Sequence, residues 1–299
     1  MRILVPVDGN EISSHAIDFI ASRTTLLGSN PKIEILNVQL PLPTRACRLV
    51  GQDSLSRYYE DEAEKIFQPM REKLAQVGFK AEEVFLVGDP SDEITAEADR
   101  INADLIIMGS RGQNTLKGLF FGSVSNGVLA KSKRPVLVLR DNTTPKSDAM
   151  KVGVAVDGSK YGRAAVKYML KHVSLFGTGA QFSVINVVSD YAGAVMPDMA
   201  GMALPALSEE EVLELQKEEF NDALDPLRPL FAKAAIKPKE ICLVGNAGDE
   251  IAAYAKKKKL DLIIMGSHGY GRFKAAFLGS TATRIAAQGN VPLLIIRQA

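Results

Sequence analysis

Asp104-Leu105-Ile106-Ile107-Met108-Gly109-Ser110 recurs later in the chain as Asp261-Leu262-Ile263-Ile264-Met265-Gly266-Ser267. Each copy runs on into Gly-x-x-Gly, then nine residues, then Gly-Ser. An apolar run before a glycine-rich loop, with a helical pattern behind it, is where backbone N–H groups can be aimed at an anion. The repeat therefore predicts two related phosphate-binding loops.

The chain has 299 residues, about twice the length of a typical domain, and the repeat indicates how they divide. We expect a first domain at residues 1–140, a linker at 141–148 and a second domain at 149–299. Each half is long enough to bury a core of its own.

An insertion distinguishes the second half from the first. Equivalent residues lie 149 positions apart near the start of the halves and 157 apart later, so the second half holds a net insertion. We place the insertion at 191–206, which is rich in Ala, Gly, Met and Pro and is expected to be a surface loop. Ser208 and Glu211 have the spacing of a capping box, which predicts a helix opening at Ser208.

Short apolar runs alternate with helical patterns in both halves. The expected strands of the first half are 3–7, 33–38, 84–87, 105–108 and 136–139, and the expected helices are about 11–27, 54–76, 90–100 and 123–131. The expected strands of the second half are 152–156, 182–188, 241–244, 262–265 and 293–296. Nearly continuous Val, Ile and Leu runs separated by helices indicate a parallel sheet covered on both faces.

The predicted fold class is therefore α/β, with two repeated five-stranded, doubly wound domains of the flavodoxin-like or Rossmann-like kind. In such a sheet a ligand crevice forms where the strand order reverses, at the carboxyl ends of the first and fourth strands. Asp8 and Gly109 stand at these ends in the first half, and Asp157 and Gly266 in the second.

Composition narrows the classes of partner. The chain is 46% hydrophobic and 24% charged, with a formal net charge of +1, so no strong field attracts nucleic acid or an anionic membrane. No apolar run approaches the ~18 residues of a membrane span, and the first residues read as a strand without a leader, so we expect a cytoplasmic protein. Cys47 and Cys242 fall in different halves and are expected to be reduced structural thiols.

The glycine loop supplies three features: backbone without Cβ atoms, exposed N–H donors and a helix N-terminus. Ser123 and Ser280 are expected at the N-cap of the helix that follows, where a hydroxyl can cap the helix or bind phosphate. Arg111 and its counterpart His268 lie inside the loops, as phosphate contacts or as solvated residues.

Asp8 and Asp157 each follow the first strand of their half. One interpretation makes them caps of the first helix. The other gives each carboxylate a ligand role, accepting hydrogen bonds from ribose hydroxyls or holding the water shell of a magnesium ion. Both roles are compatible with one residue.

Several motifs of known chemistry are absent from the sequence. There is no Gly-x-x-x-x-Gly-Lys-Ser/Thr, no Gly-x-Gly-x-x-Gly after the first strand, no His-Glu-x-x-His and no Gly-x-Ser-x-Gly. His15 and His172 fall on or near the first helix of each half, so neither loop has an evident nucleophile and base beside it. Binding is favoured over catalysis.

Together these residues resemble the universal stress protein family, in its tandem two-domain form. The resemblance covers nearly the whole chain and rests on Val-Asp-Gly after the first strand, Asn-Val at the end of the second, Gly-Asp-Pro after the third and the Gly-x2-Gly-x9-Gly-Ser loop. Intact loops in both halves are similar to those of the ATP-binding branch. The second half departs from the pattern at Ala155, which stands where the first half has Pro6, and at His268.

The resemblance implies that ATP, ADP or AMP binds with magnesium, adenine lying near Val38 and Val187 and ribose near Asp8 and Asp157. The residues expected to contact nucleotide are Pro6, Asp8, Val38, Met108, Gly109, Arg111, Gly112, Gly122, Ser123, Val124 and Ser125 in the first half. In the second half they are Asp157, Val187, Met265, Gly266, His268, Gly269, Gly279, Ser280 and Thr281. It also implies that the last strands, 136–140 and 293–297, join the halves as an internal pseudo-dimer, with a homodimer of the whole chain left open.

Three functions remain at this point. The leading one is a stress-response protein that binds an adenine nucleotide and regulates an unidentified protein partner. A slow ATPase or phosphotransferase is the enzymatic alternative, because magnesium and positioning alone support slow hydrolysis. The third is an interaction module without nucleotide, with 191–206 as its contact surface.

Overall fold

The computed structural model describes residues 1–23, 27, 31–43, 51–110, 121–140, 148–191, 207–267, 278–288 and 291–297. The elements of the first half are β1 (Arg2–Val7), α1 (Glu11–Ala21), β2 (Lys32–Gln39), α3 (Gln52–Gln76), β3 (Ala81–Val87), α4 (Pro90–Arg100), β4 (Leu105–Gly109), α5 (Ser123–Lys131) and β5 (Val136–Leu139). The second half has β6 (Lys151–Ala155), α6 (Lys160–Lys171), a 3-10 turn (Val173–Phe176), β7 (Gln181–Val188), α7 (Glu209–Leu224), α8 (Arg228–Lys233), β8 (Lys239–Val244), α9 (Ala247–Lys258), β9 (Leu262–Gly266), α10 (Ser280–Gln288) and β10 (Leu293–Ile296).

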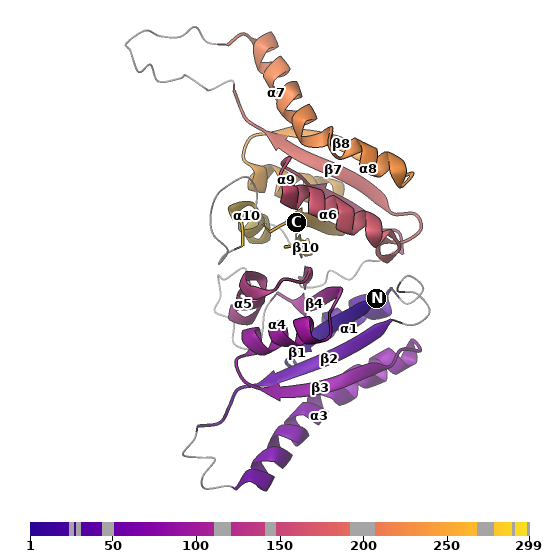
Figure 1. Ribbon diagram of the computed structural model, residues 1–299, viewed down its shortest axis with the longest axis vertical. Coiled ribbons are helices and arrows are strands. Elements are labelled where there is room, and N and C mark those ends of the chain that lie inside the picture. Colours follow the sequence, from indigo (N-terminus) through magenta and orange to yellow (C-terminus); the bar gives the residue numbers. More distant parts are fainter. Residues whose placement is uncertain are drawn as a thin grey trace, which may run out of the picture.

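All ten strands form one sheet, in the order β3-β2-β1-β4-β5-β10-β9-β6-β7-β8 (Figure 1). Within each half every pair of neighbouring strands is parallel, and the order reverses direction beside the first strand. The halves meet where β5 and β10 pair antiparallel, Val138 opposite Leu293 and Val136 opposite Ile295. The predicted fold class is confirmed, and the last strands join the halves as the resemblance implied.

Alternating side chains give the sheet a core on each face. Ile3, Val5 and Val7 of β1 belong to the cluster under α1, α3, α6 and α7, whereas Leu4 and Ile106 belong to the cluster under α4, α5, α9 and α10. Both clusters run through the two halves without a break, because the strands that meet at the junction are fully buried. Each such Val, Leu or Ile contributes about 1.5–3 kcal/mol relative to an exposed position.

Side-chain hydrogen bonds also connect the two halves across the junction of β5 and β10. The Arg23 guanidinium at the end of α1 is 1% exposed and donates to the Asp148 carbonyl at 2.9 Å. In the other direction, the Tyr168 hydroxyl of α6 donates to the Asp104 carbonyl at 3.1 Å, and Arg297 donates to the Leu129 carbonyl. These bonds fix the two halves against each other beyond the strand pairing alone.

Several predicted boundaries differ from the structure, three of them for a clear physical reason. The helix expected to reach about residue 27 ends at Ala21, because the Ser22 hydroxyl turns back onto the Phe19 carbonyl at 2.7 Å and competes with helix continuation. The outer strands β3 and β8 begin at Ala81 and Lys239, earlier than predicted. Their first residues are half exposed and partly charged, as suits an edge strand, so a search for continuous apolar runs misses them.

The second half contains one helix that was not predicted, α8. The predicted capping box opens α7: the Ser208 hydroxyl accepts from the Glu211 N–H, and the Glu211 carboxylate accepts from the Ser208 N–H. Cys242 is a free thiol, as predicted, but it lies exposed on β8 and does not belong to the core. Cys47, the linker residues 141–147 and the insertion residues 192–206 lie outside the described part of the chain.

Two buried carboxyl groups face each other between β2 and α4. Glu34 and Glu97 are 4% and 5% exposed, and the Arg100 Nε donates to Glu97 at 2.7 Å. The Arg100 hydrogen bond lowers the pKa of Glu97, whereas burial and the hydrogen bond with Glu97 raise the pKa of Glu34 to about 8. Arg100 and the exposed Glu82 of β3 are the other charges acting on Glu34. The pair therefore holds one proton at neutral pH.

We predict that Glu34→Gln flattens the pH dependence of stability. A folded-state pKa above the unfolded value of ~4.3 means that the stabilisation from this group is present in acid and is lost as pH rises through about 8. The wild-type melting temperature should fall between pH 6 and pH 9 more than that of Glu34→Gln, which keeps the hydrogen bond without a proton to lose. The exposed Glu82→Gln is the control, and equal slopes in wild type and Glu34→Gln would contradict the assignment.

Candidate functional site

An open pocket lies at the carboxyl ends of β1 and β4, with about 540 Å³ of empty space, part of it open to solvent. Its wall combines apolar side chains with a few polar groups. The lining residues are Pro6, Val7, Asp8, Leu36, Val38, Pro90, Ile94, Met108, Gly109, Val124 and Ser125. The structure thus brings together the sequence-predicted Pro6, Asp8, Val38, Met108, Gly109, Val124 and Ser125.

Four lining residues were not named from the sequence. Val7 and Leu36 are ordinary strand residues, and nothing in their pattern separates them from the core. Pro90 and Ile94 come from the first turns of α4, which packs over β2. The Gly-Asp-Pro after the third strand was a usable signal, because it fixes where α4 begins beside the crevice.

Asp8 orders the turn that leaves β1. Its Oδ1 accepts from the backbone N–H of Asn10 at 3.3 Å and its Oδ2 accepts from the Asn10 side chain at 3.0 Å, while Gly9 takes a φ of 79°. Asp157 does the same in the second half, accepting from the Ser159 N–H at 3.1 Å across Gly158 at φ 78°. In both turns a positive φ is required, which glycine adopts without strain.

Ser159 caps α6, accepting from the Gly162 N–H at 3.2 Å. The interpretation of Asp157 as the helix cap is therefore wrong. The carboxylate stands two residues earlier, over the turn, because α6 begins only at Lys160. It is exposed just beyond the carboxyl end of β6.

A buried asparagine in each half ties the second strand to the first. The Asn37 amide donates to the Val7 carbonyl at 2.9 Å, and the Asn186 amide donates to the Val156 carbonyl at 3.0 Å. Both bonds lie directly before the site aspartates and hold the strand ends that present them. The sequence signal was the repeat of Asn-Val at the end of strand two, which served only for alignment.

Both glycine loops are closed by the same pair of backbone bonds. In the first half the Ser110 N–H donates to Leu139 at 2.9 Å and the Gly122 N–H donates to Ser110 at 2.7 Å. In the second half the Ser267 N–H donates to the Ile296 carbonyl at 2.9 Å and the Gly279 N–H donates to Ser267 at 3.2 Å. The loop ends are thus fixed to the last strand of each half.

The predicted contact residues between these loop ends are not part of the described chain. They are Arg111, Gly112, His268 and Gly269. The Ser125 hydroxyl of α5 donates to the Gly109 carbonyl at 2.9 Å, holding the helix against the end of β4. Ala282 stands at the equivalent position in the second half and cannot form that bond.

Ser123 was predicted as an N-cap, and this prediction is wrong. Gly122 occupies the cap position with φ −65° and ψ 164°, no side chain caps α5, and Ser123 is its first helical residue. The Gly122 carbonyl accepts the first helical hydrogen bond, from the Asn126 N–H at 2.9 Å, so the helix starts one residue earlier than predicted. Ser280 likewise is the first residue of α10, and both hydroxyls are exposed at a helix N-terminus.

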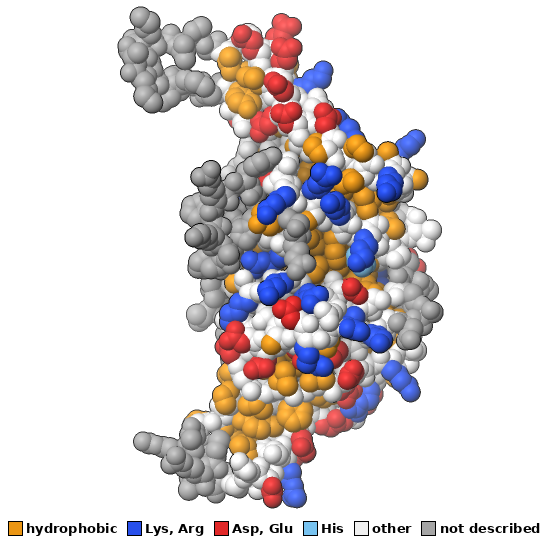
Figure 2. Space-filling view, in the orientation of Figure 1, with side chains coloured by type: hydrophobic (Ala, Val, Ile, Leu, Met, Phe, Trp, Pro, Cys, Tyr) orange, Lys and Arg blue, Asp and Glu red, His pale blue; other side chains and the backbone are white. Residues whose placement is uncertain are grey.

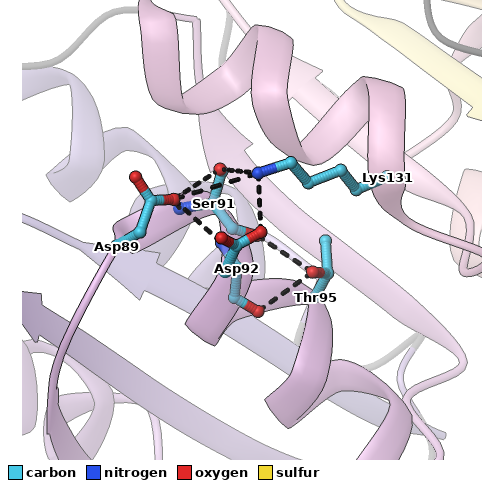
Figure 3. Close-up of polar contacts among 5 residues, drawn as sticks. All are labelled: Asp89, Ser91, Asp92, Thr95 and Lys131. Atoms are coloured by element: carbon cyan, nitrogen blue, oxygen red, sulfur yellow. Dashed lines mark hydrogen bonds and ion pairs between the residues drawn. The ribbon is translucent and has the colours of Figure 1, made fainter.

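A polar cluster joins the two helices that wall the first pocket (Figure 3). Asp89 caps α4, accepting from the N–H groups of Ser91 at 3.0 Å and Asp92 at 3.1 Å. Its carboxylate also accepts from the Ser91 hydroxyl at 2.7 Å, and this bond is the main cause of its lowered pKa. Lys131, the last residue of α5, donates to the Ser91 hydroxyl at 2.7 Å and to Asp92 at 2.6 Å. Thr95 donates back to the Ser91 carbonyl at 3.0 Å.

In the second half, different residues join the equivalent helices α9 and α10. Asn246 caps α9, accepting from the Gly248 N–H at 3.1 Å, and the Arg284 Nε donates to Asp249 at 2.7 Å. Where the two helices cross, the halves carry a glycine on different helices. Gly127 on α5 faces Ser91 in the first half, whereas Gly248 on α9 faces Arg284 in the second.

The second crevice differs in its walls. Val187, Met265 and Gly266 lie at the ends of β7 and β9, as predicted from the offset, but Ala155 and Ala247 stand where the first half has Pro6 and Pro90. Thr281 replaces Val124 on the helix behind the loop. Gly266 lies against the first turn of α6, where an added Cβ would be 2.6 Å from the Tyr161 Cβ.

Among the described residues, no group of three or more His, Cys, Asp or Glu is placed to hold a metal ion. No described helix is both long and apolar enough to cross a lipid bilayer.

The fold and the paired loops define a tandem, doubly wound α/β protein whose halves close their glycine loops in the same way. The Universal stress protein family model matches residues 1–140 and 149–297, so the chain belongs to the universal stress protein family.

Individual relatives agree with this membership. A universal stress protein of Methanocaldococcus jannaschii is 37% identical over 154 residues, which cover 46% of this chain and 94% of the relative. One from Mycolicibacterium smegmatis is 22% identical over 303 residues, covering 99% of this chain and 96% of the relative. The crystal structure of a universal stress protein from Archaeoglobus fulgidus has the same fold, with a TM-score of 0.72, 24% identity and coverage of 100% of this chain and 98% of that one.

The helix crossing beside the first pocket yields a stability prediction. A Cβ added at Gly127 would lie 2.5 Å from the Ser91 Cβ, so Gly127→Ala should destabilise by ~1–3 kcal/mol, although alanine normally stabilises a helix interior. Combining it with Ser91→Gly, the arrangement of the second half, should cost less than the sum of the single changes. Thermal unfolding of the four proteins measures this coupling, and strict additivity would refute the crossing as the cause.

Proposed function

We propose that this chain is a cytoplasmic stress-response protein that binds ATP, or another adenine nucleotide, in each half and acts as a nucleotide-dependent regulator of a protein partner. The observation that carries the proposal is the pocket between β1 and β4, bounded by Asp8 and by a glycine loop closed onto the sheet. The same loop closure and the same aspartate turn recur in the second half. We assign the two units to residues 1–140 and 149–299, with 141–148 as linker.

The residues of the pocket fit the parts of a nucleotide. Val38, Ile94 and Met108 offer an apolar slot of the kind that takes a flat base, and Asp8 and Ser125 add polar groups to the same pocket. Asp8 stands where a carboxylate can accept from ribose hydroxyls. The exposed Ser123 hydroxyl and the N-terminus of α5 lie behind the loop, where phosphate is favoured by the helix dipole.

Magnesium belongs to the proposal as a companion of the phosphates. It would supply charge neutralisation to the polyphosphate. Asp8 and Asp157, the carboxylates at the crevice mouths, are the residues that we propose to reach it through water.

Nucleotide should stabilise the folded protein. A ligand that binds only the native state adds RT ln(1 + [L]/Kd), about 2.7 kcal/mol at a hundredfold excess over Kd. Melting curves with and without millimolar ATP, ADP or AMP and magnesium test this, using protein shown by mass spectrometry to be free of co-purified nucleotide. A melting midpoint that none of the three nucleotides changes would contradict the proposal and favour the interaction-module alternative.

The two loops should bind independently. Gly112→Val or Gly269→Val should each remove one site, because a bulky β-branched side chain would fill the space that we propose for the phosphate. Calorimetry should then give half the wild-type stoichiometry, with circular dichroism confirming the fold. Two full-strength sites in both variants would place the phosphate contact elsewhere.

A further inference from the structure

Helix α4 forms one wall of the first pocket and packs on strand β2. The helix contributes Pro90 and Ile94 to the lining, and the strand contributes Leu36 and Val38. Ile94 and Leu36 are both buried and belong to the same core cluster. The shape of the pocket therefore depends on how closely α4 lies on β2.

The first turn of α4 is held by charges that persist above neutral pH. Asp89 caps this turn, and Lys131 joins it to α5 through the ion pair with Asp92 at 2.6 Å (Figure 3). The hydrogen bond to Asp92 raises the pKa of Lys131, so the lysine stays charged between pH 7 and 9. This end of the helix is fixed throughout that range. Figure 2 shows basic and acidic side chains mixed on the face of the first half that it draws, so no field of one sign covers that face.

The next turn of α4 is held on β2 by the buried pair of Glu34 and Glu97. Glu97 follows Ile94 by three residues and lies on the same face of the helix. Glu34 precedes Leu36 by two residues and lies on the same face of the strand. The pair is thus one helical turn and one strand repeat away from two residues that line the pocket.

The surroundings of Glu34 do not compensate a negative charge. One carboxyl oxygen, Oε1, is buried and has no hydrogen-bond partner in the described part of the chain. The Arg100 guanidinium lies 3.6 Å from Oε2, beyond hydrogen-bond distance, and donates to Glu97 instead. A buried carboxylate in this position costs free energy unless it is protonated.

The charged groups that act on Glu34 come from α4 and β3. Burial is the largest cause that raises the pKa of Glu34 to about 8; Glu97 raises it further, Arg100 lowers it and Glu82 raises it. The exposed Glu82 of β3 stands opposite Glu34 in the strand register, whereas the facing residue of β1 is the buried Leu4. Helix α3 packs on the other face of the sheet. The shared proton therefore leaves just above neutral pH.

The second half has no carboxyl group at the equivalent positions. Ser183 of β7 stands where the first half has Glu34, and Tyr254 of α9 stands where it has Glu97. The strand neighbour of Ser183 is Lys239, in place of Glu82. A proton shared between strand and helix is therefore a property of the first half.

We propose that Glu34 and Glu97 are positioning residues of the first-half site: their shared proton seats α4 on β2, and its loss moves the Pro90 and Ile94 wall and weakens nucleotide binding there, but not in the second half. The proposal rests on the proposed function and adds a regulation of that site by pH. Two adjacent carboxylates in a buried place repel each other, and the repulsion is relieved when the helix separates from the strand. Nucleotide then binds the protonated form more tightly, and binding near pH 8 takes up protons.

Calorimetry of the full-length protein with ATP and magnesium tests the proposal between pH 7.5 and 9.5, above the second phosphate pKa of about 6. Titrations at pH 8 in two buffers of different ionisation enthalpy measure the protons taken up on binding. Wild type should take up a fraction of a proton per chain and Glu34→Gln none. The Kd of one site in wild type should rise by up to about tenfold for each pH unit above about 8, and both Kd values of Glu34→Gln should stay constant.

A matched control separates the pair from its neighbours. Glu82→Gln removes the exposed carboxylate opposite Glu34 and leaves the buried pair, so it should keep the proton uptake. If Glu34→Gln does not fold, Glu34→Ser, which has the residue of the second half, replaces it. All titrations are made well below the melting temperature at each pH, so that a higher Kd reports the pocket rather than unfolding.

The outcomes distinguish the two hypotheses. Equal proton uptake in wild type and Glu34→Gln, or the same rise of Kd with pH in both, would overturn the inference while nucleotide binding stands. Absence of ATP binding at pH 7.5 in wild type and in the variants would overturn the proposed function and the inference together.

Discussion

The antiparallel contact between β5 and β10 is the interaction on which the rest of the molecule depends. It turns two five-stranded sheets into one and buries the apolar faces of both last strands completely. It also sets the geometry of the crevices. The strands twist progressively away from this contact, as strands in sheets do. In Figure 1, β3 at the edge of the first half and β7, the neighbour of the edge strand β8 in the second half, point toward the same side of the molecule, although the central strands β5 and β10 run in opposite directions.

The sequence predicted the architecture because the strands that matter most are buried on both faces. Continuous apolar runs such as those of β4 and β9 have no competing interpretation once helices flank them. The edge strands and the end of α1 were less predictable, since they depend on partial exposure and on one serine hydroxyl that turns back on its own helix.

The site was predictable to the extent that it is made of backbone. Asp8 and Gly109 follow from strand order and glycine spacing, Val38 was implied by the family resemblance, and the pocket brings the three together. Ser123 was misplaced by one residue because the first helical hydrogen bond goes to the carbonyl of Gly122, whereas Ser is the residue type that a sequence pattern favours as a cap. Pro90 and Ile94 escaped notice because they reach the crevice only through the packing of α4 on β2, a tertiary contact.

At the helix crossing the two halves carry the glycine on different helices, and this limits which exchanges between the halves keep the packing. Each half needs one residue without a side chain where its two helices touch, but the first half has it on α5 and the second on α9. A single helix transplanted from one half to the other would bring either two side chains or two glycines to the crossing. Recombination between the repeats therefore preserves packing only when both helices, with the strand and loop between them, move as one block.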